Sequence, residues 1–195
     1  MLFRSSGIVD LDASPRDNIN ALAKAKGVKA GEITVLILDR LRHADLIVSC
    51  REAGAAIRLI TDGDVAGVIH TTQPEHTGVD LYLGTGGAPE GVLAAGALRC
   101  VGGQMQGRLI LDTESKIERA RKMGVEDPKK KYDMHQLASG DVIVCATGVT
   151  DGALLQGVKF GKELIETETV IYRSVTGTVR RIRAEHREMA KFRLD

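Results

Sequence analysis

The feature that most constrains the fold of this chain is a regular alternation of short apolar runs with helical segments between residues 15 and 101. Three apolar runs have the length of buried strands: residues 33–38, 56–60 and 79–83. Helices are expected around them, at about residues 15–26, 44–53, 64–72 and 89–101. Because the connections are short and the run at 33–38 is continuous, the pattern predicts an α/β fold around a mostly parallel sheet.

The rest of the chain has a looser pattern. A charged amphipathic helix is expected at residues 115–123, and another buried strand at residues 141–146. Residues 166–172 and 178–185 alternate as two antiparallel strands around Thr176-Gly177. There is no internal repeat or linker, so residues 1–195 are expected to form one domain.

Composition excludes several classes of protein. The formal net charge is +1, aromatic residues make up only 3% and Trp is absent, so nucleic acid is not an expected partner. No window has the length and hydropathy of a membrane span, and no signal peptide is evident. The three cysteines, Cys50, Cys100 and Cys145, are far apart in apolar surroundings, which favours buried, reduced thiols over a zinc site.

The clearest candidate for a binding site is the glycine-rich turn GTGGAPEG at residues 84–91, between a strand and a helix. Backbone N–H groups in such a turn suit an anion. Glu90 adds a carboxylate to the first helical turn, which makes sense if a cation lies between it and a phosphate. Residues 86–91 also match the letters of a dinucleotide fingerprint, but Glu90 would repel a pyrophosphate, so this alternative is less favoured.

Polar residues follow the other apolar runs as well. Arg42-His43 comes after the first strand, Asp62-Gly63-Asp64 after the second and Thr147-Gly148 after the strand at 141–146. If these strands are parallel, all of the groups lie at one edge of the sheet, where ligands of such folds bind. Each group also has an interpretation without a ligand. Arg42-His43 could be a solvated helix start, Asp62-Gly63-Asp64 a turn with an Asp N-cap, and Thr147-Gly148 a simple turn at the end of a strand.

Five ordered motifs carry a family resemblance: LRHAD at 41–45, TDGDV at 61–65, GGAPEG at 86–91, QGRL at 106–109 and ATGVT at 146–150. From about Gly7 onward the chain resembles the C-terminal half of class II fructose-1,6-bisphosphatase. The resemblance implies a layered α/β/α sandwich of the sugar-phosphatase superfamily with a C-terminal antiparallel pair. It also implies a homo-oligomer, while the reduced cysteines and the missing signal peptide lead us to expect a cytoplasmic protein.

The activity that the resemblance implies is hydrolysis of the 1-phosphate of fructose 1,6-bisphosphate in gluconeogenesis, with Mn²⁺ or Mg²⁺. Sedoheptulose 1,7-bisphosphate is a possible second substrate. Matched position by position, Glu90 is the expected metal ligand. The expected substrate-binding residues are Arg42, His43, Ala44, Asp62, Gly63, Asp64 and Gly87. Two positions depart from the family: Leu41 replaces a usual Pro, and Ala44 stands where some members have Asp.

The larger departure is that the acidic N-terminal half of the family has no counterpart, and Met1–Ser5 look foreign to it. No catalytic residue is therefore assigned, and we expect the chain to be inactive alone, because one carboxylate does not make such a metal site. It could instead be a non-catalytic phosphosugar-binding module, or one subunit of a split enzyme with the missing half as partner. An apolar face normally covered by the other half should favour self-association.

Overall fold

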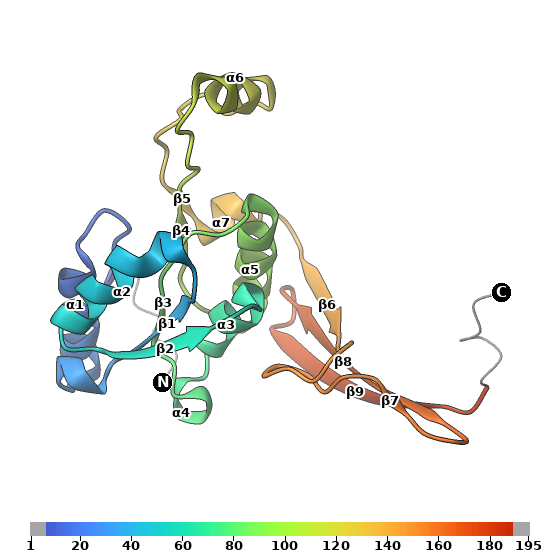
Figure 1. Cartoon of the computed structure of the whole chain (residues 1–195). Helices are drawn as coiled ribbons and strands as arrows, with labels where there is room; N and C mark the ends of the chain where they lie inside the picture. The colour runs from blue at the N-terminus through green and yellow to red at the C-terminus, as the bar shows by residue number, and fades with distance from the viewer. Residues whose placement is uncertain (1–6, 189–195) are drawn as a thin grey trace.

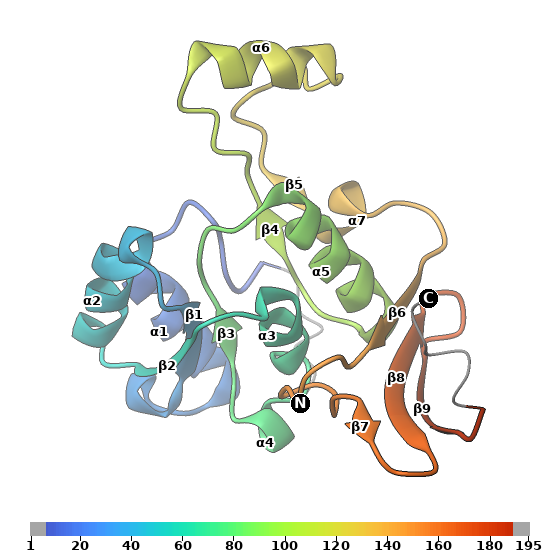
Figure 2. The same ribbon diagram turned by 45° about the vertical axis from the view of Figure 1, so that its right-hand side comes forward.

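A computed structural model describes residues 7–188, and the helices and strands alternate in layers (Figures 1 and 2). The order up to residue 101 is α1 Pro15–Lys26, η1 Ala30–Glu32, β1 Thr34–Leu38, η2 Leu41–His43, α2 Ala44–Glu52, β2 Ala56–Ile60, α3 Asp64–His70, α4 Pro74–Thr77, β3 Leu81–Tyr82 and α5 Ala88–Val101. The remainder comprises β4 Gln106–Gly107, α6 Glu114–Lys122, β5 Tyr132–Asp133, α7 Met134–Leu137, β6 Ile143–Thr147, β7 Lys159–Phe160, β8 Ile165–Arg173 and β9 Thr178–His186. The expected α/β class is confirmed.

The first sheet is parallel, with the strand order β2-β1-β3. Thr34 of β1 pairs with Ala56 of β2, and Val35 pairs with Leu81 of β3. The central strand β1 is buried from Val35 to Leu38, as its continuous apolar run predicts. The strand predicted at 79–83 is confirmed, although only two of its residues pair with β1.

One face of this sheet is covered by α1 and α2. The α1 helix begins at Ser14, whose hydroxyl accepts a hydrogen bond from the Asp17 N–H, and ends at Gly27 in the left-handed region. Its inner side chains, including Ile19, pack with β1 and with Ile47 of α2 in one core cluster. The predicted caps thus fix the length of a helix that buries one side of the sheet.

The other face of the sheet is covered by α3 and α5. A side chain at Gly67 of α3 would place its Cβ 2.7 Å from Leu36 Cδ2, so α3 approaches β1 closely only because this residue is glycine. On the far side of α5, a Cβ at Gly96 would lie 3.3 Å from Val142 Cγ1. The helix α5 therefore lies between the parallel sheet and a second sheet (Figure 2).

The second sheet is antiparallel, with β8 paired to β6, β7 and β9. The predicted antiparallel pair at the C-terminus is confirmed as β8 and β9. The interpretation of residues 141–146 as a buried strand that could belong to the parallel sheet is wrong. Residues of β6 alternate between half-buried and exposed because only one face packs on α5, and the thiol of Cys145 is exposed rather than buried.

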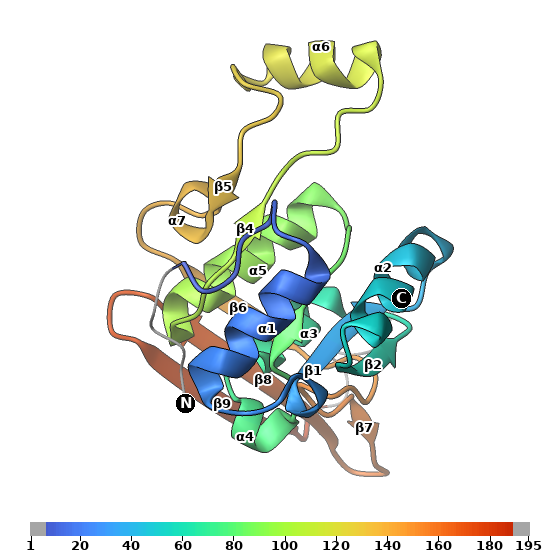
Figure 3. The same cartoon turned by 90° about the vertical axis from the view of Figure 1, so that its left-hand side faces the viewer.

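The helix predicted at 115–123 is α6, and it projects away from the layers (Figures 1 and 3). The two chain segments that support it are joined by the short antiparallel pair of β4 and β5. At its base Arg108 pairs with Asp12 at 2.6 Å, and Lys131 pairs with Asp10 at 2.7 Å. These ion pairs attach the arm to the segment that precedes α1.

Candidate functional site

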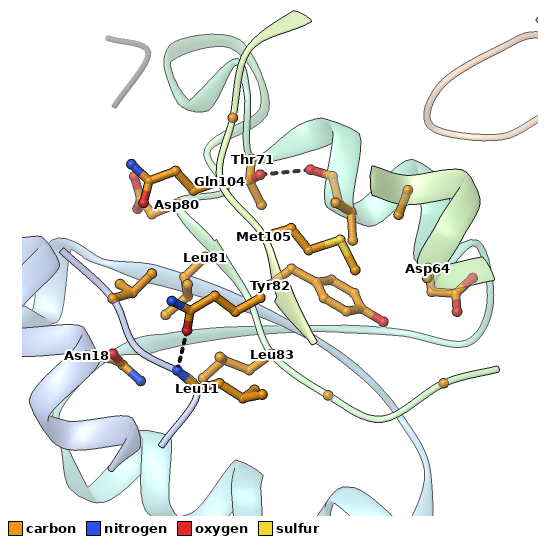
Figure 4. Close-up of a pocket in the computed structure, with 18 of the residues that line it drawn as sticks. Leu11, Asn18, Asp64, Thr71, Asp80, Leu81, Tyr82, Leu83, Gln104 and Met105 are labelled. Atoms are coloured by element: carbon orange, nitrogen blue, oxygen red, sulfur yellow. Dashed lines mark hydrogen bonds between the residues drawn. The ribbon is translucent and has the colours of Figure 1, made fainter. Parts of the chain in front are cut away.

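The glycine-rich turn borders a cavity of about 540 Å³ beside β3 (Figure 4). Its lining includes Arg42, His43, Asp64, Gly87 and Glu90. These residues come from three segments, each following one strand of the parallel sheet. The expectation that the carboxyl ends of parallel strands gather the site is therefore confirmed for β1, β2 and β3.

Arg42 contacts the turn from the exposed side. Its Nε and NH2 both donate to the backbone carbonyl of Thr85, at 2.9 and 2.7 Å. These two hydrogen bonds hold the middle of the turn against η2. The guanidinium group of Arg42 lies in the wall of the cavity. The side chain thus combines a structural contact with a positive charge at the site.

His43 contacts the same turn from the buried side, and its side chain is 2% exposed. Its Nδ1 is 2.8 Å from the carbonyl oxygen of Leu38, and its Nε2 accepts a hydrogen bond of 2.9 Å from the N–H of Thr85. The tautomer protonated on Nδ1 satisfies both bonds. A Cβ at Gly84 would lie 3.2 Å from the ring, so glycine is needed for this close approach. In this structure His43 is a residue that positions the turn.

The two carboxylates of the site lie against consecutive glycines. A Cβ at Gly86 would be 3.0 Å from Oδ2 of Asp64, and a Cβ at Gly87 would be 2.1 Å from Oε2 of Glu90. The missing side chains make room for the two acids at one place. Glu90 also lies in the first turn of α5, where the helix dipole favours a negative charge.

These donors have the chemistry that a hard divalent cation requires. Carboxylate oxygens are the preferred ligands of Mg²⁺ and Mn²⁺. Asp10 and Asp80 also line the cavity, but they are paired with Lys131 and Lys26. No group of three or more His, Cys, Asp or Glu side chains that could hold a metal is found within residues 7–188. The described residues thus fit one side of a metal site and not a complete one.

Tyr82 of β3 forms part of the wall between Asp64 and the interior. Its ring points toward the side on which Asp64 lies (Figure 4). Burial raises the pKa of Tyr82 to about 12, and the negative charge of Asp64 adds to the effect, while Arg42 opposes it. The phenol therefore keeps its proton at neutral pH and offers an O–H donor beside the carboxylate.

Several predicted residues are not in the cavity wall. Ala44, Asp62 and Gly63 do not line it, although Gly63 holds the left-handed backbone that begins α3. Their expected roles in substrate binding stay predictions. Thr147-Gly148 does not join the edge of the parallel sheet, because β6 belongs to the antiparallel one.

Sequence reasoning missed the apolar part of the cavity. Its wall includes Leu11, Leu22, Val68, Leu81, Tyr82 and Met105. The pattern of 79–83 showed the strand but gave no sign that one of its edges would face a cavity. Thr85, whose backbone is held by both Arg42 and His43, was also missed, because side-chain motifs do not report backbone contacts.

No helix within residues 7–188 is both long enough and apolar enough to cross a membrane.

Comparison with known proteins identifies a family. Residues 3–186 match the family model described as bacterial fructose-1,6-bisphosphatase, glpX-encoded. A D-fructose 1,6-bisphosphatase class 2/sedoheptulose 1,7-bisphosphatase of Synechococcus sp. (strain JA-3-3Ab) is 40% identical over 196 residues, which cover 94% of this chain and 56% of that relative. A relative of the same name from Synechococcus elongatus is 38% identical, with 93% and 56% covered. The chain thus spans just over half the length of these relatives.

Proposed function

Because this chain belongs to the family of bacterial, glpX-encoded fructose-1,6-bisphosphatases, we propose that it is part of a metal-dependent phosphatase that hydrolyses the 1-phosphate of fructose 1,6-bisphosphate. The names of its Synechococcus relatives support this substrate and add sedoheptulose 1,7-bisphosphate as a second one. The observation that carries the proposal is the convergence of Arg42, Asp64 and Glu90 on one cavity at the carboxyl end of the parallel sheet.

The residues have different tasks in this proposal. Glu90 supplies an oxygen ligand to one side of a Mn²⁺ or Mg²⁺ site, and a bound cation would polarise the phosphoryl group. Arg42 stabilises the negative charge of the phosphate, and Gly87 keeps the turn open to the substrate. His43 holds Thr85, and through it the backbone of the turn. Asp64 is proposed to contact the substrate from the cavity wall, and Asp62, Gly63 and Ala44 to contact the sugar from outside it.

The 195-residue chain is proposed to form one domain and to be inactive, or nearly so, by itself. Beside the glycine-rich turn its site offers two carboxylates, those of Asp64 and Glu90, whereas Mg²⁺ and Mn²⁺ sites of phosphatases use several acidic oxygens. The remaining carboxylates would come from the part of the family protein that this chain does not span. A phosphosugar-binding module without catalysis is the second candidate, which the arginine and the glycine-rich turn also support.

Calorimetric titration with fructose 1,6-bisphosphate, with and without Mn²⁺, tests the proposal. Binding should require both Arg42 and the cation, so Arg42→Ala and Glu90→Gln should each weaken it by about tenfold or more. Phosphate release should be negligible for the chain alone. Rapid turnover by the chain alone would contradict the shared site, and binding of a nicotinamide dinucleotide in place of the sugar bisphosphate would contradict the function.

A further inference from the structure

The side chain of Tyr82 lies on the opposite face of the parallel sheet from its two neighbours in the chain. Leu81 and Leu83 pack with the core cluster of α1 and α2, whereas Tyr82 packs against a cluster from α3 and α5 that includes Ala94. A Cβ at Gly67 of α3 would lie 3.3 Å from Cε2 of the Tyr82 ring. The ring is thus held between β3 and two helices, in the wall of the cavity (Figure 4).

The hydroxyl group of Tyr82 forms no hydrogen bond with any other residue between 7 and 188. In this part of the chain no fully buried side-chain N or O atom lacks a partner, so the unpaired hydroxyl is one that solvent or a ligand reaches. Because burial raises the pKa of Tyr82 to about 12, the group is protonated at neutral pH and can donate. The cavity wall therefore presents one free O–H donor.

Asp64 presents an acceptor on the side toward which the Tyr82 ring points (Figure 4). Its Oδ1 accepts a hydrogen bond of 3.0 Å from the N–H of Val65. Its Oδ2 lies 3.0 Å from the place of a Cβ at Gly86, and no residue between 7 and 188 donates a hydrogen bond to it. One carboxylate oxygen is thus held by the backbone, and the other is available to a ligand.

A donor and an acceptor on the same side of a cavity match a hydroxyl group of a ligand. A hydroxyl oxygen accepts from the phenol, and its proton is donated to the carboxylate. A phosphate oxygen can only accept, and the charge of Asp64 would repel it, whereas the guanidinium of Arg42 in the same cavity wall suits a phosphate. A ligand with both hydroxyl and phosphate groups fits this set of side chains.

We propose that Tyr82 and Asp64 together bind one hydroxyl group of a sugar phosphate, while Arg42 faces a phosphate of the same ligand. The inference rests on the proposed function and deepens it, because it names the group of the substrate that this wall of the cavity recognises. Tyr82 lies outside the motifs TDGDV and GGAPEG, so it adds a substrate-binding residue to the expected set.

The test compares three ligands in the presence of Mn²⁺. Fructose 1,6-bisphosphate carries hydroxyl groups and two phosphates, and hexane-1,6-diol bisphosphate carries the two phosphates without free hydroxyl groups. Glucose 6-phosphate, which is neither the proposed substrate nor its product, carries hydroxyl groups and one phosphate. Calorimetry measures the affinities, and an NMR titration of the amides of residues 82–91 measures those too weak for calorimetry.

Tyr82→Phe and Tyr132→Phe form a matched pair of variants, because each removes one hydroxyl group and keeps the ring. Tyr132 of β5 lies outside the cavity, with Nζ of Lys130 4.9 Å from the centre of its ring. Tyr82→Phe should weaken fructose 1,6-bisphosphate binding by about three- to tenfold and leave hexane-1,6-diol bisphosphate binding within about twofold. Tyr132→Phe should change neither affinity. Since the Tyr82 hydroxyl has no partner within residues 7–188, both variants should unfold at the same urea concentration as the unchanged protein.

The outcomes separate the hydroxyl contact from the proposed function. Equal affinities of the two variants for fructose 1,6-bisphosphate overturn the contact and leave the function standing. An equal loss for hexane-1,6-diol bisphosphate also overturns it, because the phenol would then bind a phosphate, and a marked loss of stability in Tyr82→Phe would show that its hydroxyl serves the fold. Binding of glucose 6-phosphate that depends on Tyr82, without binding of fructose 1,6-bisphosphate, supports the contact and contradicts the function. Binding of neither sugar phosphate by the unchanged protein overturns both.

Discussion

Gly87 allows a direct test of how the candidate metal ligand is held. A Cβ at this position would lie 2.1 Å from Oε2 of Glu90, and Cβ atoms essentially never approach other heavy atoms within 3.0 Å. In Gly87→Ala the Glu90 carboxylate must therefore move by roughly 1 Å, several times the tolerance of a metal–ligand distance. The backbone at residue 87 has φ −72° and ψ 145°, which alanine adopts freely.

The substitution should separate metal binding from stability. Gly87 is the N-cap of α5, and replacing an N-cap glycine by alanine costs about 1 kcal/mol or less, because the alanine also restricts the unfolded chain. The displaced carboxylate should weaken Mn²⁺ binding by about tenfold or more. Paramagnetic broadening of the backbone amides of residues 84–91 during Mn²⁺ titration measures the affinity, and urea denaturation measures the free energy of unfolding.

Gly91→Ala is the matched control in the same helix. The nearest foreign atom to its Cβ would be Met105 Cε at 3.9 Å, so this alanine fits and should stabilise α5 by about 0.5–1 kcal/mol. Its Mn²⁺ affinity should be unchanged, while Glu90→Gln should lose affinity as Gly87→Ala does. Equal Mn²⁺ affinities for Gly87→Ala and Gly91→Ala would refute the placement of the Glu90 carboxylate over Gly87.

Three further predictions concern the scaffold. His43→Ala leaves the buried carbonyl of Leu38 and the partly buried N–H of Thr85 without their partner and should lower the free energy of unfolding by about 1–3 kcal/mol in urea denaturation. Gly67→Ala inserts a methyl group 2.7 Å from a methyl of Leu36 and should cost about 1–3 kcal/mol in the same assay, rather than stabilise α3 as alanine usually does. Hydrogen bonds from Arg108 and, second, from Lys131 lower the pKa of Asp12 from 3.8 to about 2. Since the pKa of this carboxyl is lowered in the folded protein, its contribution to stability is present above about pH 4 and lost as the pH falls toward 2. An NMR titration should show that midpoint, and Arg108→Ala should move it back toward 3.8.

The parts of the fold that sequence predicted best are those governed by local patterns. Caps such as Ser14 and Gly27, and the continuous apolar run of β1, depend on residues close in the chain, and the structure confirms them. The same holds for β8 and β9, whose alternation and central turn define a hairpin. Within the site, the gathering of Arg42 and Glu90 followed from the rule for parallel sheets.

What the sequence did not predict depends on the partner that each segment packs against. The run of β6 is as apolar as a parallel strand, but its neighbour is β8, so alternate residues such as Cys145 face outward. A short apolar run does not reveal whether one or both of its faces are covered. The open edge of β3 escaped prediction for the same reason, since an edge is a property of the whole sheet.

The contacts around Thr85 show how the glycine-rich turn is held in place. The guanidinium of Arg42 donates to the carbonyl of Thr85, and the ring of His43 accepts a hydrogen bond from its N–H. Both polar backbone groups of Thr85 are therefore bound by side chains of the described residues. The turn that presents Glu90 is therefore positioned without help from another chain. A ligand that enters the cavity would meet a turn that is already formed, and little of its binding free energy would be needed to order the glycine-rich turn. It follows that removing the His43 ring should lower both the affinity for a ligand of the turn and the free energy of unfolding, because one side chain supports both.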